Sequence, residues 1–205
     1  MLTSAEQAAR WALRGHCRCK TGDSTLQSLR FSLYAFVLFT ATAFTSQSSV
    51  SHAAAAPGAG RSARATAEIE QLMAEYHQAV ASHNGARLSS LFIDKGSTWF
   101  NVLSDAAYAR ARAKSPAALK VRHSSFQWFA NIVSTSHSAL DPEHSNVRIL
   151  TDGTIGAVYF NFTFFVDGKP ENQGSETWQL VRTSDGWKIA SIVYSSDPPA
   201  PGQQK

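Results

Sequence analysis

One carboxylic acid stands out among the residues that could do chemistry, because it lies in an apolar alternating segment near the C-terminus. In the stretch GSETWQLVR, Glu176 shares one strand face with Trp178 and Leu180. A carboxyl group on so apolar a face would have a raised pKa and could act as a general acid or base. The alternative is a position at the rim of the face, in contact with solvent. The sequence leaves both interpretations open.

A tyrosine on the apolar stripe of a predicted helix is the second candidate. Tyr76 directs its hydroxyl into the domain, where that group needs a hydrogen-bond partner. The partner is either a bound molecule or a backbone carbonyl group of the core. His77 borders the stripe and is interpreted as a surface or half-buried structural histidine. The stripe consists of Ile69, Leu72, Met73, Tyr76 and Val80.

Motifs for metals and for nucleophilic catalysis are missing from the sequence. His123, His137 and His144 lie in separate predicted elements without H-x-x-x-H or H-x-H spacing, so we predict no metal site. There is no glycine-rich phosphate loop, no G-x-S-x-G and no paired-carboxylate motif, and no cofactor is indicated.

Hydrophobic periodicity arranges the chain as helices first and strands afterwards. Helical patterns cover 65–85, 86–92 and 124–137. A strand is predicted at 97–103, and a broken helical insertion with Pro116 covers 104–123. After Pro142 the period changes to two. Strands are predicted at 144–150, 154–166, 174–182 and 186–196, separated by Asp-Gly turn sequences and by a longer loop, 167–174. This order predicts an α+β domain with helices on one face of a curled antiparallel sheet.

The charge of the chain is unevenly distributed. The formal net charge is +4, and residues 1–56 hold five Lys or Arg against two acids, a net of +3. The remainder, near +1, gives no electrostatic case for nucleic acid. Within the insertion, five basic residues form either a cationic lip for an anionic ligand or a solvated helix face. They are Arg110, Arg112, Lys114, Lys120 and Arg122.

The first 56 residues have the pattern of an export leader. The apolar run RFSLYAFVLFTATAF, 30–44, follows a cation and precedes small residues with A-x-A-like cleavage sites at 53–56. We therefore expect a periplasmic or secreted protein without stable membrane insertion after cleavage. The alternative is an uncleaved N-terminal membrane anchor. Cys17 and Cys19 lie upstream of the run, so the mature chain would have neither disulfides nor thiol chemistry.

After the leader, we expect a flexible linker at 57–66, one folded domain at 67–197 and a disordered tail at 198–205. Four segments of that domain, in this order, carry a family resemblance: EIEQLMAEYHQAVASHN, LFIDKGSTWF, NVRILTDGTIGAVYFNFTF and SETWQLVRTSDGWKIASIVYSS. They resemble the nuclear transport factor 2-like superfamily, above all its SnoaL-like and kinase association-domain branches. The resemblance implies helices packed into a strongly curved antiparallel sheet that forms a cone-shaped half-barrel.

The resemblance also implies candidate site residues. In a comparison with ketosteroid isomerase, Tyr76 occupies the position of a residue that donates a hydrogen bond to the oxyanion. Gln179 lies near the position of a second such donor. The general-base position falls on Phe100 or Asn101, neither of which can take a proton at neutral pH, so that isomerase chemistry is not supported. The best catalytic candidates are Tyr76, Asn101, Glu176 and Gln179. The expected pocket consists of Met73, Tyr76, Val80, Trp99, Phe129, Val133, Trp178 and Tyr194.

Two arguments disagree about which sheet face lies inside the cone. Hydrophobicity points Trp178, Leu180 and Ile189 inward, whereas the isomerase comparison points Thr177, Gln179, Ile192 and Tyr194 inward. Burial of one face in the cone and the other in a homodimer would reconcile them.

Three functions remain open from the sequence. The first is binding of a small hydrophobic or amphipathic molecule in the cone, without assigned activity. The second is a cofactor-independent isomerase, cyclase or dehydratase of the SnoaL-like type. The third is an oligomerisation or interaction module.

Overall fold

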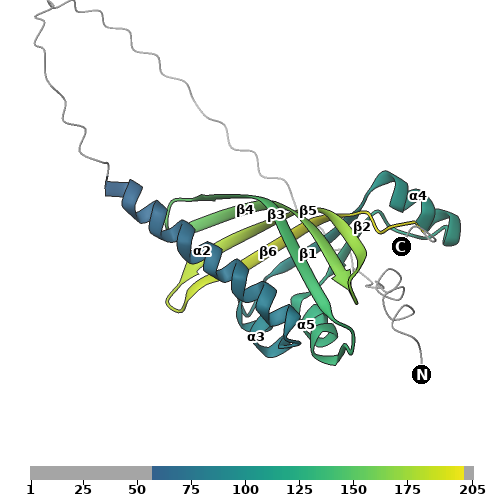
Figure 1. Ribbon diagram of the computed structural model, residues 1–205. Helices are drawn as coiled ribbons and strands as arrows, with labels where there is room; N and C mark the ends of the chain where they lie inside the picture. The colour runs from purple at the N-terminus through teal and green to yellow at the C-terminus, as the bar shows by residue number, and fades with distance from the viewer. Residues whose placement is uncertain (1–56, 201–205) are drawn as a thin grey trace, which may run out of the picture. The chain divides into compact units, whose positions relative to one another are not determined.

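The computed structural model describes residues 57–200, which form four helices and six strands (Figure 1). The leader and its cleavage site, residues 1–56, and positions 201–205 of the predicted tail lie outside the described residues. The helices are α2 (Pro57–Ala81), α3 (Gly85–Ser90), α4 (Asp105–Lys114) and α5 (Phe126–Thr135). The strands are β1 (Thr98–Leu103), β2 (Val121–Ser124), β3 (Leu140–Thr151), β4 (Ile155–Val166), β5 (Lys169–Thr183) and β6 (Gly186–Ser196).

The six strands form one curled, unclosed sheet in the order β2-β1-β6-β5-β4-β3, and α2 crosses one side of it (Figure 1). Neighbouring strands are antiparallel except β1 and β6, which run parallel. The predicted α+β class with helices packed on a strongly curved sheet is confirmed. Within the part of the chain that the structure describes, no helix is long and apolar enough to cross a membrane.

The loop predicted between the second and third C-terminal strands is much shorter than expected. β5 begins at Lys169, which pairs with Val166, so Asp167 and Gly168 alone connect the two strands. Their φ angles, 52° and 73°, are both positive, as the tight two-residue hairpin turn requires. The sequence 169–174 looked like turn chemistry because it contains proline, asparagine and glycine, yet it lies in the strand.

Two further boundaries differ from the sequence-based elements. The insertion was expected to be a helix broken at Pro116. α4 does end at Lys114, because the residue before Pro116 is extended, but the chain then forms the strand β2, which was not predicted. β3 begins at Leu140 and passes through Pro142, earlier than predicted. Proline is tolerated there because β3 is an edge strand of the sheet.

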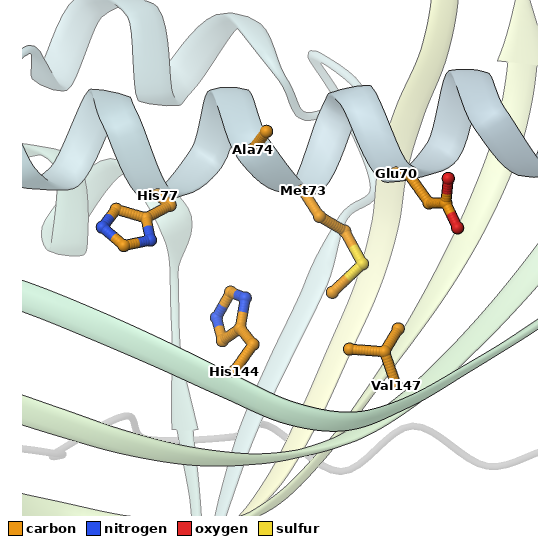
Figure 2. Close-up of a pocket in the computed structure, with 6 residues that line it drawn as sticks. All are labelled: Glu70, Met73, Ala74, His77, His144 and Val147. Atoms are coloured by element: carbon orange, nitrogen blue, oxygen red, sulfur yellow. The ribbon is translucent and has the colours of Figure 1, made fainter.

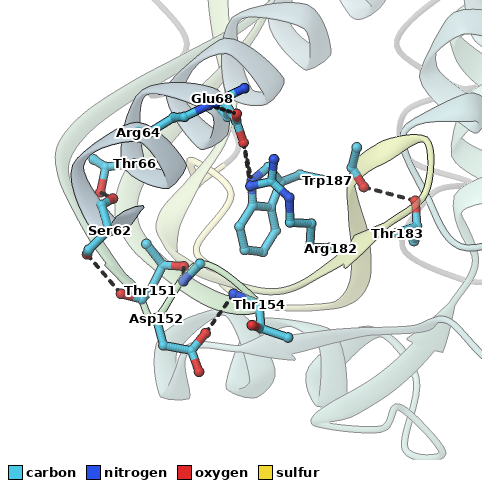
Figure 3. A network of polar contacts seen from close by, with 12 residues as sticks. Ser62, Arg64, Thr66, Glu68, Thr151, Asp152, Thr154, Arg182, Thr183 and Trp187 are labelled. Atoms are coloured by element: carbon cyan, nitrogen blue, oxygen red, sulfur yellow. Dashed lines mark hydrogen bonds and ion pairs between the residues drawn. The ribbon is translucent and has the colours of Figure 1, made fainter. Parts of the chain in front are cut away.

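The segment 57–66, expected to be a flexible linker, forms the first turns of α2. Side chains near this end of the helix bind the β3–β4 and β5–β6 hairpins (Figure 3). Ser62 Oγ donates to the Thr151 carbonyl over 3.0 Å. The Glu68 carboxylate accepts a hydrogen bond from Trp187 Nε1 at 3.1 Å and pairs with Arg182 at 2.6 Å. These long-range contacts have no periodic signature in the sequence.

A β-bulge decides which face of the sheet lies inside. Gln179 pairs with Ser191, but Leu180 pairs with Ile189, so Ala190 is an extra residue in β6. The extra residue shifts the alternation of β6. As a result Trp178, Leu180, Ile189, Ile192 and Tyr194 are all buried on the concave side, whereas Gln179 is exposed. The hydrophobic argument is therefore right for Trp178, Leu180 and Ile189, and the family comparison is right for Ile192 and Tyr194 but not for Thr177 and Gln179.

Removal of the Glu68 carboxylate should loosen the start of α2. Arg182, and then Arg64, hold the pKa of Glu68 below its ordinary value, so the carboxylate is ionised and joins the helix to β5 and β6. We expect Glu68→Ala to speed amide hydrogen exchange at 60–68 while exchange in β5 stays slow. Gln71→Ala, which loses only an exposed bond to Glu75, is the control. Identical exchange in Glu68→Ala and the wild type would contradict this role.

Candidate functional site

A row of side chains crosses the concave face of the sheet at one level. Strand register places Asn101 of β1 beside Tyr194 of β6, and Tyr194 beside Glu176 of β5. Arg122 of β2 continues the row beyond Asn101, and Phe160 of β4 continues it beyond Glu176. Because alternate residues point to the same side, these side chains share the face that carries Trp178. We call Tyr76, Asn101, Glu176 and Tyr194 the concave cluster.

Glu176 is only partly exposed, and its carboxyl lies among aromatic side chains. Trp178 Nε1 donates a hydrogen bond to Glu176 Oε1 over 2.5 Å. Burial raises the pKa of Glu176 to about 7, an effect that the bond from Trp178 opposes. A carboxyl with this pKa is present in both protonation states near neutral pH, which suits a general acid or base. Of the two positions that the sequence left open for Glu176, the structure has the partly buried one on the concave face.

Asn101 and Tyr194 form a buried hydrogen bond. Asn101 is 6% exposed, and its Nδ2 donates to Tyr194 Oη over 2.7 Å. The other amide atom, Asn101 Oδ1, is buried and accepts no hydrogen bond in the described part of the chain. Burial also raises the pKa of the Tyr194 hydroxyl. Asn101 is thus an amide at the inner face of β1, with one polar atom still to be satisfied.

Tyr76 joins the concave cluster from α2. Its ring centroid lies 4.9 Å from that of Trp178, and the residue is 5% exposed. Burial, and then the electrostatic influence of Glu176 and Tyr194, raise the pKa of Tyr76 well above its ordinary value. Within residues 57–200 the structure gives the Tyr76 hydroxyl no hydrogen bond. The sequence analysis had considered a bond from this hydroxyl to a backbone carbonyl of the core, and no such bond is present among these residues.

The deep part of the cone is filled by side chains. Trp99 packs against Phe129 with ring centroids 5.4 Å apart, and Trp178 packs against Phe160 at 5.3 Å. The expected pocket therefore needs a correction, because all eight of its residues belong to the buried hydrophobic core. Of these eight, Met73 also lines the groove described next. Close packing of large aromatic rings fills the space that the curvature of the sheet would otherwise leave.

A groove of about 330 Å³ opens between α2 and β3 (Figure 2). Met73 and His77 extend from the helix toward His144 on the strand. The ring of His144 also contacts Tyr76 and Phe160, with centroids 6.2 and 4.5 Å away. Burial, and then His77, lower the pKa of His144 to about 4, so its imidazole is neutral at physiological pH. Sequence spacing gave no signal for this groove; its lining residues are Glu70, Met73, Ala74, His77, His144 and Val147.

Gln179 lies apart from the concave cluster. It is exposed on the convex face, where it lines a second groove of about 310 Å³ together with Leu150, Tyr159 and Thr177. Gln179 alternates along β5 with the inward Trp178 and Leu180 and therefore points to the convex face. Gln179 is therefore not a neighbour of Tyr76.

The basic insertion does not form a uniform cationic lip. Arg110 pairs with Asp197 at 3.3 Å and donates to the Pro198 carbonyl, while Lys120 pairs with Asp105. Arg122 instead lies on the concave side next to Asn101, and burial lowers its pKa. Within the described residues, no group of three or more His, Cys, Asp or Glu side chains could hold a metal ion.

Comparison with known proteins identifies the family. Residues 69–201 match the family model described as a SnoaL-like domain. This match covers more than half of the chain, which therefore belongs to the SnoaL-like family within the nuclear transport factor 2-like superfamily. The resemblance noted from sequence is thereby confirmed. No curated protein matches the sequence.

Solved structures with a similar fold come from several bacteria. A nuclear transport factor 2-like protein of unknown function from Shewanella baltica is 11% identical, with 67% of this chain and 97% of that one covered and a TM-score of 0.47. A similar protein with a cystatin-like fold from Novosphingobium aromaticivorans is 12% identical, with coverages of 68% and 86% and a TM-score of 0.49. A third, from Pseudomonas putida, is 14% identical, with coverages of 70% and 94% and a TM-score of 0.49. These similarities concern the fold alone.

The raised pKa of Glu176 predicts a pH-dependent effect of Glu176→Gln. The folded protein binds the proton more tightly than the unfolded chain, so the wild type loses stability as pH rises from about 4.5 to about 7. The glutamine keeps an acceptor for Trp178 Nε1 but cannot lose a proton. We therefore compare the free energy of unfolding of the variant with that of the wild type at each pH. This difference should be about 1–3 kcal/mol more in favour of the variant above pH 8 than below pH 4.5.

Urea unfolding of both proteins across this range measures the difference. The lowered pKa of His144 acts with the opposite sign, since its contribution to stability is lost as pH falls from about 6.5 to about 4. That contribution is common to both proteins and cancels in the difference. A difference that does not change with pH would show that Glu176 lies in solvent.

Proposed function

We propose that this SnoaL-like domain binds a small amphipathic molecule on the concave face of its sheet, with the polar end of the molecule at the concave cluster. The observation that carries the proposal is the buried Asn101 amide, whose Oδ1 has no hydrogen-bond partner in the described residues. Its Nδ2 bonds Tyr194, which pairs in turn with Glu176 on a face that is otherwise aromatic. Polar groups that converge within an apolar concavity are the usual composition of a small-molecule site.

The concave face offers an apolar surface next to these polar groups. Phe164 and Val166 are only partly buried, and they pack against the core at the end of β4. Phe162 lies in the same strand and contacts the ring of Tyr194, with centroids 5.8 Å apart. Because the deep interior is filled, the bound molecule would cover this outer part of the cone, where Glu176 still meets solvent.

Proton-transfer catalysis is the second candidate, favoured by the pKa of about 7 at Glu176. Such a carboxyl could remove a proton from a bound molecule, while the hydroxyl of Tyr76 donates a hydrogen bond to the oxygen on which negative charge develops. Asn101 cannot act as a base. The reaction would be an isomerisation, cyclisation or dehydration in which no cofactor takes part.

Tyr76→Phe separates a role in binding from a role in stability. The substitution keeps the ring against Trp178 and removes a hydroxyl without an internal partner in residues 57–200. The free energy of unfolding should stay within about 0.5 kcal/mol of the wild type. Affinity for 2-naphthol, used as an amphipathic probe in calorimetric titration, should fall by about 2- to 10-fold, the effect of one hydrogen bond.

Tyr108→Phe, on α4, is the matched control and should change neither quantity. A Tyr76→Phe protein that is markedly less stable, yet binds the probe as tightly as the wild type, would show that the hydroxyl is structural.

We also propose that the convex face of the sheet mediates a homodimer. Tyr159 lies beside Thr177, and Thr177 beside Val193, on the face opposite the concave cluster. Tyr159 and Val193 are 45% and 39% exposed, and Leu150 and Ile155 are more exposed still. Contiguous exposed apolar side chains of this kind are typical of protein–protein contacts.

Charge placed on this face should disrupt the dimer. We expect a dimeric mass for the wild type and a monomeric mass for Tyr159→Lys, measured by light scattering at micromolar concentration, because an unpaired ammonium would be buried in the contact. Leu119→Lys, at an exposed apolar residue between α4 and β2, should remain dimeric. A monomeric wild type would refute the dimer, and a dimeric Tyr159→Lys protein would place the contact elsewhere.

A further inference from the structure

The amide of Asn101 lacks one particular interaction. Its Nδ2 already donates to Tyr194 Oη, and Oδ1 is buried without a donor among the described residues. An amide oxygen held away from water without a hydrogen bond is unfavourable, and natural proteins rarely leave one so. A molecule that completes this site must therefore bring a hydrogen-bond donor to Asn101 Oδ1.

The charges beside Asn101 narrow the choice of donor. The carboxyl of Glu176 raises the pKa of Tyr194, and the guanidinium of Arg122 lowers it, so groups of opposite charge act on the same hydroxyl. A carboxylate on the ligand could not donate to Asn101 Oδ1 and would lie near the Glu176 carboxyl. An ammonium could donate, but it would enter a concavity that already holds Arg122, at a high desolvation cost. An uncharged donor avoids both penalties.

We infer that the polar end of the bound molecule is an uncharged hydroxyl, as in a phenol or an alcohol with an apolar body, which donates its hydrogen bond to Asn101 Oδ1. The hydroxyl oxygen could in turn accept a hydrogen bond from Tyr76, whose ring packs on Trp178 of the same sheet face. The apolar body then lies against Phe162 and Phe164 of β4. This inference rests on the proposed function and specifies the class of ligand for the same site.

Four probes with one bicyclic skeleton test it: 2-naphthol, 2-acetylnaphthalene, 2-naphthoate and 2-naphthylmethylamine. They present, in this order, a neutral donor, an acceptor without a donor, an anion and a cation. Calorimetric titration of the protein at neutral pH gives the four affinities. We expect 2-naphthol to bind about 5- to 10-fold more tightly than 2-acetylnaphthalene, the difference that one hydrogen bond makes, and more tightly than either ion.

Two substitutions assign the preference to Asn101. Asn101→Asp keeps an acceptor in the same shape and should retain the preference for 2-naphthol over 2-acetylnaphthalene. Asn101→Leu removes the acceptor and should abolish that preference, while the shared skeleton still binds. Because Asn101→Leu also deprives Tyr194 of a partner, its folding is checked by circular dichroism. If Asn101→Leu fails to fold, two other variants provide the test. Asn101→Asp should keep the preference for 2-naphthol, and Asn101→Ser, whose side chain is too short to reach the ligand, should lose it.

The outcomes distinguish this inference from the proposed function on which it rests. Tightest binding of the ketone, the acid or the amine would overturn the hydroxyl assignment and leave the concave binding site in place. A preference for 2-naphthol that survives in both Asn101→Leu and Asn101→Ser would also overturn it. Failure of all four probes to bind would refute the proposed function itself.

Discussion

The arrangement of this domain depends on the contact between Tyr76 of α2 and Trp178 of β5, whose ring centroids lie 4.9 Å apart. Trp178 is wholly buried and also packs against Phe160 and the ring of His144. Its indole nitrogen donates to Glu176. The side chain of Trp178 thus packs the helix onto the sheet, helps to fill the cone and orients the carboxyl of Glu176. A substitution at Trp178 would therefore change the packing and the polar cluster together.

The pairing of the strands brings the polar residues of the site together. The parallel pairing of β1 with β6 brings Asn101 to Tyr194, and the antiparallel pairing of β6 with β5 brings Tyr194 to Glu176. These three residues come from segments far apart in the sequence. Their proximity follows from the sheet order, and the bulge at Ala190 keeps Ile189, Ile192 and Tyr194 on one face. Tyr76 of α2 packs on Trp178, which lies on the same sheet face as these residues.

The sequence predicts the parts of this structure that leave a periodic signal. The stripe through Tyr76 and the antiparallel meander are examples, and alternation also places Glu176 on the same strand face as Trp178. Which face lies inward, and whether Glu176 meets solvent, stayed open in the sequence. The bulge at Ala190 has no such signal, so neither argument from the sequence placed both Ile189 and Ile192 of β6 on the inward face. The ordered start of α2 depends on Glu68 meeting Arg182 and Trp187, more than a hundred residues away. The filling of the cone depends on side-chain volumes in three dimensions, which periodicity does not report.

The protonation of Glu176 tests most directly whether the polar cluster lies inside the concave face. Carbon-13 NMR of the side-chain carboxyl, with the resonance assigned through Glu176→Gln, follows this single group from pH 4 to 9. A carboxyl buried beside Trp178 and Tyr76 should titrate with a pKa of about 7. Titration at the ordinary pKa of a solvent-exposed glutamate, about 4.3, would place Glu176 at the surface and contradict the proposed site.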